Sequence, residues 1–176
     1  MLFARHALIS LSLAGLIGLA VASWVIIGGR FDVSVAAQLP QPVHDLIHQT
    51  RVNAVRREVR SLEAQPANLD DPTVLRSAAK TFQALCSDCH HPPGEQPSML
   101  ARSLNPPPAD LTEAAGKRSL QELYWVTKHG IRMSAMPAWG RSESDEDLWA
   151  LASLVARFPD MHSEEFSALL AKQDEP

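Results

Sequence analysis

Two cysteines and a histidine form the most chemically specific motif in the chain. Cys86 and Cys89 are separated by two residues, and His90 directly follows the second cysteine. Thiols at this spacing can reach two vinyl groups along one porphyrin edge, and an imidazole at the next position can reach the iron. The C-x-x-C-H pattern is typical of covalent c-type haem attachment. The sequence contains no second such motif, so it predicts one covalent haem c with His90 as an iron ligand.

Three other uses of the cysteine pair explain less of the sequence. A disulfide is possible in an oxidising compartment, but it gives His90 no role. A reactive thioredoxin-like pair sits at the start of a helix, whereas this pair follows a predicted helix. A zinc site would need His44 and His48, an i,i+4 pair, to fold onto the motif, and no other feature supports that.

Met136 is the candidate for the second axial ligand. An iron that only exchanges electrons needs a strong sixth ligand, and a methionine thioether raises its reduction potential. Met136 lies in a proline-containing loop, just after a predicted helix that ends near Gly130. We expect Met133, in the same loop, to pack or to point outward. The remaining methionines beyond the motif are Met99, which is too near it, and Met161.

The N-terminal segment has the length and composition of a membrane helix. No charged residue lies between Arg5 and Arg30, and the apolar run Ala7–Ile27 would span roughly 30 Å as a helix. A cleaved signal peptide is the alternative, with residues 20–22 as a small-residue cleavage site. The run continues apolar beyond that site, and Trp24 suits a membrane interface. We therefore favour a retained anchor over residues 1–30, with the rest of the chain exported.

Residues 31–69 are predicted to be a linker that contains an amphipathic helix. Its apolar positions recur at roughly helical spacing up to Glu63: Val43, Leu46, Ile47, Val55, Val59 and Leu62. Four arginines of residues 51–60 occupy much of the remaining surface. Such a helix could lie on anionic lipids or on an acidic partner. We favour a solvated helix that packs one stripe on the next domain, followed by a break at 64–71.

Three helices of the domain from 70 to 160 have recognisable starts in the sequence. Asp71 and Pro72 form a good helix start, and the helix leads directly into the cysteine motif. Ser119 caps a second helix that stops at Gly130, and Ser144 caps a third that ends near residue 158. A tail with a short helix follows over 161–176. The net charge of −4 has mixed signs, so no basic surface points to a nucleic-acid partner.

The cysteine motif, the proline-rich loop after it, the run H-G-I-R-M-S-A-M-P-A-W-G over 129–140 and the closing amphipathic helix resemble the class I cytochrome c family. The chain is most similar to its membrane-anchored, monohaem bacterial members, over about residues 70–160. The resemblance implies thioether bonds at Cys86 and Cys89, with His90 as proximal and Met136 as distal ligand. It places Pro107, within 106–112, beside the haem propionates.

Two further positions bear on the haem environment. Trp139 could donate its indole N–H to a propionate or simply shield the haem. Ala78 and Phe82 stand where the resembling family has a glycine and an aromatic residue, to let its first and last helices cross closely. Alanine is a small departure, for which we expect a slightly wider crossing.

These observations predict an all-α protein: a cytochrome c-like haem domain of about four short helices with long irregular loops, preceded by a transmembrane helix and a linker helix. The expected function is single-electron transfer at the outer face of a bacterial cytoplasmic membrane, with the haem domain in the periplasm or outside. Redox proteins are the expected partners, and no small-molecule substrate is expected. The alternatives are a fixed haem subunit of a respiratory oxidase or dehydrogenase complex and, less favoured, a haem sensor or peroxidase.

Overall fold

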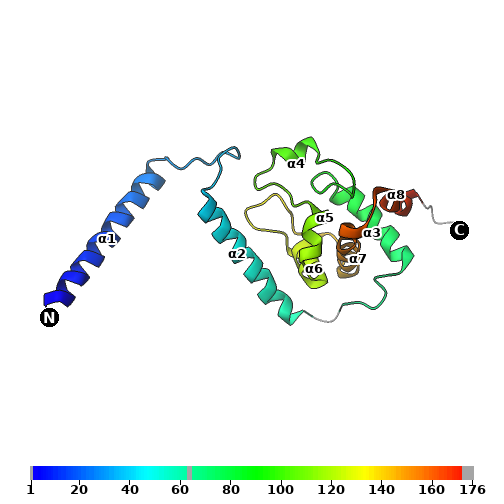
Figure 1. Cartoon of the computed structure of the whole chain (residues 1–176), viewed down its shortest axis with the longest axis horizontal. Coiled ribbons are helices and arrows are strands. Elements are labelled where there is room, and N and C mark those ends of the chain that lie inside the picture. The colour runs from blue at the N-terminus through cyan, green and yellow to red at the C-terminus, as the bar shows by residue number, and fades with distance from the viewer. Residues whose placement is uncertain (1, 63–64, 172–176) are drawn as a thin grey trace. The chain divides into compact units, whose positions relative to one another are not determined.

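The computed structural model describes residues 2–62 and 65–171, and these residues form helices joined by loops, without a strand (Figure 1). The expected all-α fold is thereby confirmed. The chain divides into two units, Met1–Leu39 and Pro40–Pro176. The expected end of the linker helix at Glu63 and the start of the break at Ala64 lie outside the described residues, as does the end of the tail over 172–176.

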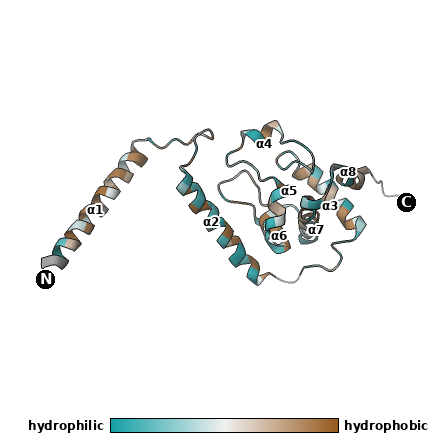
Figure 2. Cartoon of the chain, in the orientation of Figure 1, coloured by the Kyte–Doolittle hydropathy of each residue, from teal (hydrophilic) through white to brown (hydrophobic). Residues whose placement is uncertain are grey.

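The N-terminal unit consists of one long helix and an irregular segment. Helix α1 (Leu2–Ile27) is apolar along most of its length, as Figure 2 shows. Within the described chain, Arg5–Ile27 is the one stretch long and apolar enough to cross a membrane, a property that signal sequences share. Just beyond the helix, the guanidinium of Arg30 lies 4.0 Å from the ring centre of Trp24.

The C-terminal unit is built around α3 (Pro72–Leu85) and α7 (Asp145–Ala156), which pack against each other. Helix α6 (Leu120–His129) packs on α7, and α8 (Ser163–Ala171) packs on α3. The short helices α4 (Met99–Ser103) and α5 (Leu111–Ala114) lie in the long loop between α3 and α6. Single 3-10 turns complete the unit at Val59–Ser61, Ala115–Lys117, Trp139–Arg141 and Phe158–Asp160.

The helix starts follow the capping residues expected from the sequence. Asp71 accepts a hydrogen bond from the backbone N–H of Thr73 at 2.7 Å, which begins α3. Ser119 and Glu122 form a full capping box at the start of α6. At α7 the Ser144 hydroxyl accepts from the N–H of Asp147 at 3.1 Å, which makes half of a capping box, while the Asp147 carboxylate accepts from that hydroxyl at 2.5 Å.

Three phenylalanines form the centre of the main core. The ring of Phe82 makes edge contacts with Phe158 at 4.9 Å and with Phe166 at 5.8 Å between ring centres. Ala78 and Ala79 of α3 are buried beside them, where small side chains allow α3 and α7 to approach each other. Phe166 belongs to α8, so the segment after residue 160 contributes to the same core.

A second cluster joins α6 to α7. The rings of Tyr124 and Trp149 stack with their centres 3.9 Å apart and their planes 4° from parallel. Leu69, Leu148 and Ala152 are buried around this pair. These contacts fix α6, and therefore the loop that follows it, against the core.

Helix α2 (Gln41–Glu58) belongs to the C-terminal unit, where it contacts α6. Its buried side chains are Val52 and Val55, near its C-terminal end. The earlier apolar positions Val43, Leu46 and Ile47 are exposed, although the helical spacing places them in the same predicted stripe. Only the second half of the stripe is therefore covered.

The aromatic core should set the stability of the unit. We expect Phe82→Ala to lower the free energy of unfolding by about 3–5 kcal/mol, because it removes a side chain that is 0% exposed and leaves a cavity between two other rings. Thermal or denaturant unfolding measures the loss. Ser77→Ala, at an exposed position of α3, is the control and should change stability by less than about 0.5 kcal/mol. Equal effects of the two substitutions would contradict this description of the core.

Candidate functional site

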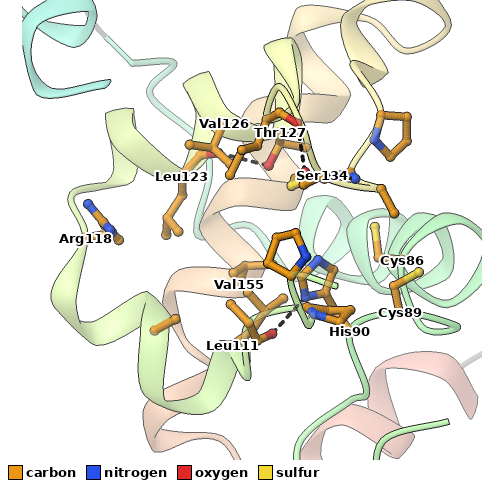
Figure 3. Close-up of a pocket in the computed structure, with 18 of the residues that line it drawn as sticks. Cys86, Cys89, His90, Leu111, Arg118, Leu123, Val126, Thr127, Ser134 and Val155 are labelled. Carbon is orange, nitrogen blue, oxygen red and sulfur yellow. Dashed lines mark hydrogen bonds between the residues drawn. The ribbon is translucent and has the colours of Figure 1, made fainter. Parts of the chain in front are cut away.

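The C-terminal unit contains a cavity of about 350 Å³. Its wall includes all six residues that the sequence singled out: Cys86, Cys89, His90, Pro107, Met136 and Trp139. Most of the other lining side chains are apolar, and the volume lies within the range of roughly 300–1,000 Å³ that is usual for ligand and cofactor pockets. Figure 3 shows the two cysteines and His90 close together on one part of this wall.

The end of α3 brings the cysteine motif to the cavity. The N–H of Cys86 donates to Phe82 O at 2.9 Å, which ends the helix on a core residue. The N–H groups of Cys89 and His90 both donate to Cys86 O, at 3.1 and 2.7 Å. The motif is therefore a closed turn that continues the helix, and it presents both thiols and the imidazole to one wall.

The imidazole of His90 is held in one orientation. Its Nδ1 lies 2.9 Å from the carbonyl oxygen of Ala109, and a carbonyl can only accept, so Nδ1 carries the proton. Burial lowers the pKa of His90, although the bond to Ala109 opposes that shift. The side chain is thus a neutral imidazole whose Nε2 lone pair is free, which is the form that binds a metal.

The Cys86 thiol lacks the lowered pKa of a reactive cysteine. Burial raises the pKa of Cys86 to about 12, and the neighbouring Cys89 and Glu143 add to the shift. Thiols that react by disulfide exchange instead have a lowered pKa in electropositive surroundings, so the thioredoxin-like alternative finds no support. Both thiols are free in the structure, without a disulfide between them. Across 2–62 and 65–171, no three His, Cys, Asp or Glu side chains gather as a metal site of the zinc type.

Gly130 positions the loop that carries Met136. Its φ is +66°, a conformation that glycine adopts easily. A Cβ there would lie 2.7 Å from Pro137 O and 2.8 Å from Met136 O, so the loop passes directly over this glycine. The Ser134 hydroxyl accepts from the N–H of Met136 at 3.2 Å and donates to Ile131 O at 2.7 Å. These bonds close the loop and hold Met136 at the cavity.

The other described methionines lie elsewhere. Met99 and Met133 are 83% and 82% exposed, and Met161 packs against the phenylalanine core. Met136 alone among these four lines the cavity. The expectation that Met133 packs or points outward agrees with its exposure.

Part of the wall was not anticipated from the sequence. Helix α2 contributes His44, Arg51, Val52 and Val55, while Arg118 and Glu122 line the cavity from the start of α6 and the turn before it. The apolar spacing of α2 was a signal for its packing, but it gave no indication of what α2 packs on. The charged residues had no sequence signal, because they belong to no recognisable motif.

The donor set fits haem c. The cavity wall holds two thiols at the attachment spacing, an imidazole whose proton on Nδ1 leaves the lone pair on Nε2, and a thioether sulfur carried by a constrained loop. A thioether and an imidazole are the protein ligands of haem iron in cytochromes c.

We expect Gly130→Ala to destabilise the unit and displace the Met136 loop, since the added methyl group would meet two backbone oxygens and favour a different φ. The cost should be at least about 1–3 kcal/mol, measured by thermal unfolding. Gly116→Ala is the control, because its Cβ would meet only Pro159, at an ordinary 3.4 Å. Unfolding temperatures that fall equally in both variants would contradict a special role for Gly130.

A comparison with known proteins finds a family match for a segment that contributes to the cavity. Residues 73–155 match the family described as "Cytochrome C oxidase, cbb3-type, subunit III". The matched segment contains the cysteine motif, the Met136 loop, helix α6 and all of α7 except its last residue. No solved structure matches the chain.

A second likeness is short. A stretch of 34 residues is 47% identical to the thymidine kinase of two strains of Halobacterium salinarum, and it covers 19% of this chain and 17% of each kinase. The chain thus spans about a sixth of the length of these curated relatives. Thirty-four residues are fewer than most independently folding domains contain, so this likeness indicates no shared fold.

The family match, by contrast, supports a c-type cytochrome domain over residues 73–155, with covalently bound c-type haem and a role in electron transfer rather than catalysis.

Proposed function

We propose that this protein is a single-electron carrier with one haem c, attached through Cys86 and Cys89, ligated by His90 and Met136, and tethered by α1 to the outer face of a bacterial cytoplasmic membrane. The observation that carries the proposal is the meeting of these four side chains around one cavity. They come from two segments about fifty residues apart in sequence.

The residues of the chain have distinct tasks in this mechanism. When bound, haem c supplies the one-electron exchange between Fe(III) and Fe(II). Ala109 fixes the His90 ring, so that ligand needs no reorientation between the two charge states. Met136 would be the second ligand of the haem iron, which would leave no coordination position for a substrate and favours electron transfer over the sensor or peroxidase alternative.

The cavity walls exclude water from the centre. Leu123, Val126 and Val155 line it with apolar side chains. Trp139 both lines the cavity and packs on the cluster formed by α6 and α7, which favours shielding over a hydrogen bond to a propionate. Pro107 lies in the wall beside Ala109, where we expect it to contact the haem near the proximal ligand.

The membrane tether rests on α1. Its length and apolar character suit a single membrane span. The apolar surface of the helix is not buried within the N-terminal unit. An anchor would confine the search for redox partners to the membrane plane and raise their effective concentration. Such partners bind weakly and briefly, through small interfaces.

A second candidate function is that of a fixed haem subunit, which the printed family description favours because it names a subunit of an oxidase. Extraction of native membranes in mild detergent distinguishes the two. A free carrier elutes as a monomer in its detergent micelle, whereas a subunit elutes with stoichiometric partners.

Met136→Ala should lower the midpoint potential of the haem, because a thioether ligand stabilises Fe(II) relative to Fe(III), and should change the visible spectrum as the sixth position opens. Spectroelectrochemical titration measures both. Met133→Ala is the matched control in the same loop, since that side chain is almost fully exposed. If Met136→Ala behaved like Met133→Ala, the ligand assignment would be wrong.

A further inference from the structure

Helix α2 forms part of the cavity wall, although it lies outside the family-matched segment 73–155. Arg51, Val52 and Val55 face the cavity from this helix, and the two valines are buried. The opposite face of the helix is exposed and carries Arg57. One face of α2 thus lines the cavity, and Arg51 gives that face a positive charge.

Arg51 is a half-buried cation without an acidic partner. Across the described part of the chain, no carboxylate lies within ion-pair distance of its guanidinium, which contacts only the Nδ1 of His48, at 3.0 Å. Burial lowers the pKa of Arg51, and the positive charge of Arg118 lowers it further. A guanidinium in such a place is costly unless an anion compensates it.

The one carboxylate in this part of the wall is already occupied. Glu122 accepts from the N–H of Ser119 at 2.9 Å, and its other oxygen lies 3.4 Å from Arg56 Nε and 3.9 Å from Arg118 Nη1. One negative charge is therefore shared by Arg56 and Arg118, and it lies beyond ion-pair distance of Arg51, which lines the cavity together with Arg118. This end of the cavity has an excess of positive charge.

The positive end lies away from the thiols. Figure 3 shows Arg118 on the opposite side of the cavity from Cys86 and Cys89. A porphyrin attached through its vinyl groups carries its two propionates on the opposite half of the ring. Guanidinium groups bind carboxylates with strong, often bidentate hydrogen bonds.

We propose that α2 is a wall of the haem pocket, and that Arg51, together with Arg118, binds the propionate carboxylates at the end opposite the thioethers. This inference rests on the proposed function, since it assumes a haem in the cavity. It gives the basic linker helix a role within the protein itself. Positive charge held near the iron in a water-poor site favours Fe(II), so α2 also raises the reduction potential.

The test compares Arg51→Gln with Arg57→Gln in full-length protein from a host that attaches haem. Both substitutions remove one positive charge from α2, but Arg57 is exposed and does not line the cavity. We expect Arg51→Gln to shift the Fe(II)/Fe(III) ratio at a fixed potential about tenfold towards Fe(III), or about 59 mV for one electron. Arg57→Gln should give a much smaller shift, and Arg51→Lys should recover part of the loss.

The outcomes separate the inference from the proposed function. If wild-type protein carries no haem by mass, the proposed function fails, and the inference falls with it. If haem is attached but Arg51→Gln and Arg57→Gln have equal potentials, only the propionate site is overturned. If Arg51→Gln fails to acquire haem while Arg51→Lys and Arg57→Gln acquire it, the need for a cation at this position is supported.

Discussion

The turn that ends α3 determines where Cys86, Cys89 and His90 lie relative to one another. Cys86 O accepts from the N–H groups of both Cys89 and His90, so the two thiols and the imidazole move as one rigid piece. The ring of His90 is then fixed by Ala109, nineteen residues further along the chain. The proposed attachment of haem at two points would tolerate little freedom, and the hydrogen bonds of this turn supply that constraint.

The turn connects the aromatic core directly to the site. The residue whose carbonyl ends α3 is Phe82, which is also the centre of the aromatic core. On the other side of the cavity, the stacked Tyr124 and Trp149 fix α6, and Gly130 lets the chain reverse sharply towards Met136. The two ligand-bearing segments are thus each tied to α7. Their separation follows from helix packing rather than from contacts within the site.

The sequence predicted the local features well, because they depend on near neighbours. Asp71 and Ser119 start their helices where expected, Gly130 ends one, and the six site residues line one cavity. The contribution of α2 could not be predicted, since apolar spacing reveals that a face is buried but not what covers it. The same limit applies to Arg51 and Arg118, because their role depends on whether the fold turns them towards the cavity.

The mass of the purified full-length protein, expressed with the haem-attachment machinery, tests the central claim most directly. One haem should add its mass to the wild-type chain, no free thiol should be titratable, and replacement of both Cys86 and Cys89 by serine should abolish the addition. The same spectrum reports whether the N-terminal segment is retained. A wild-type mass equal to that of the bare polypeptide, with two titratable thiols, would contradict the account.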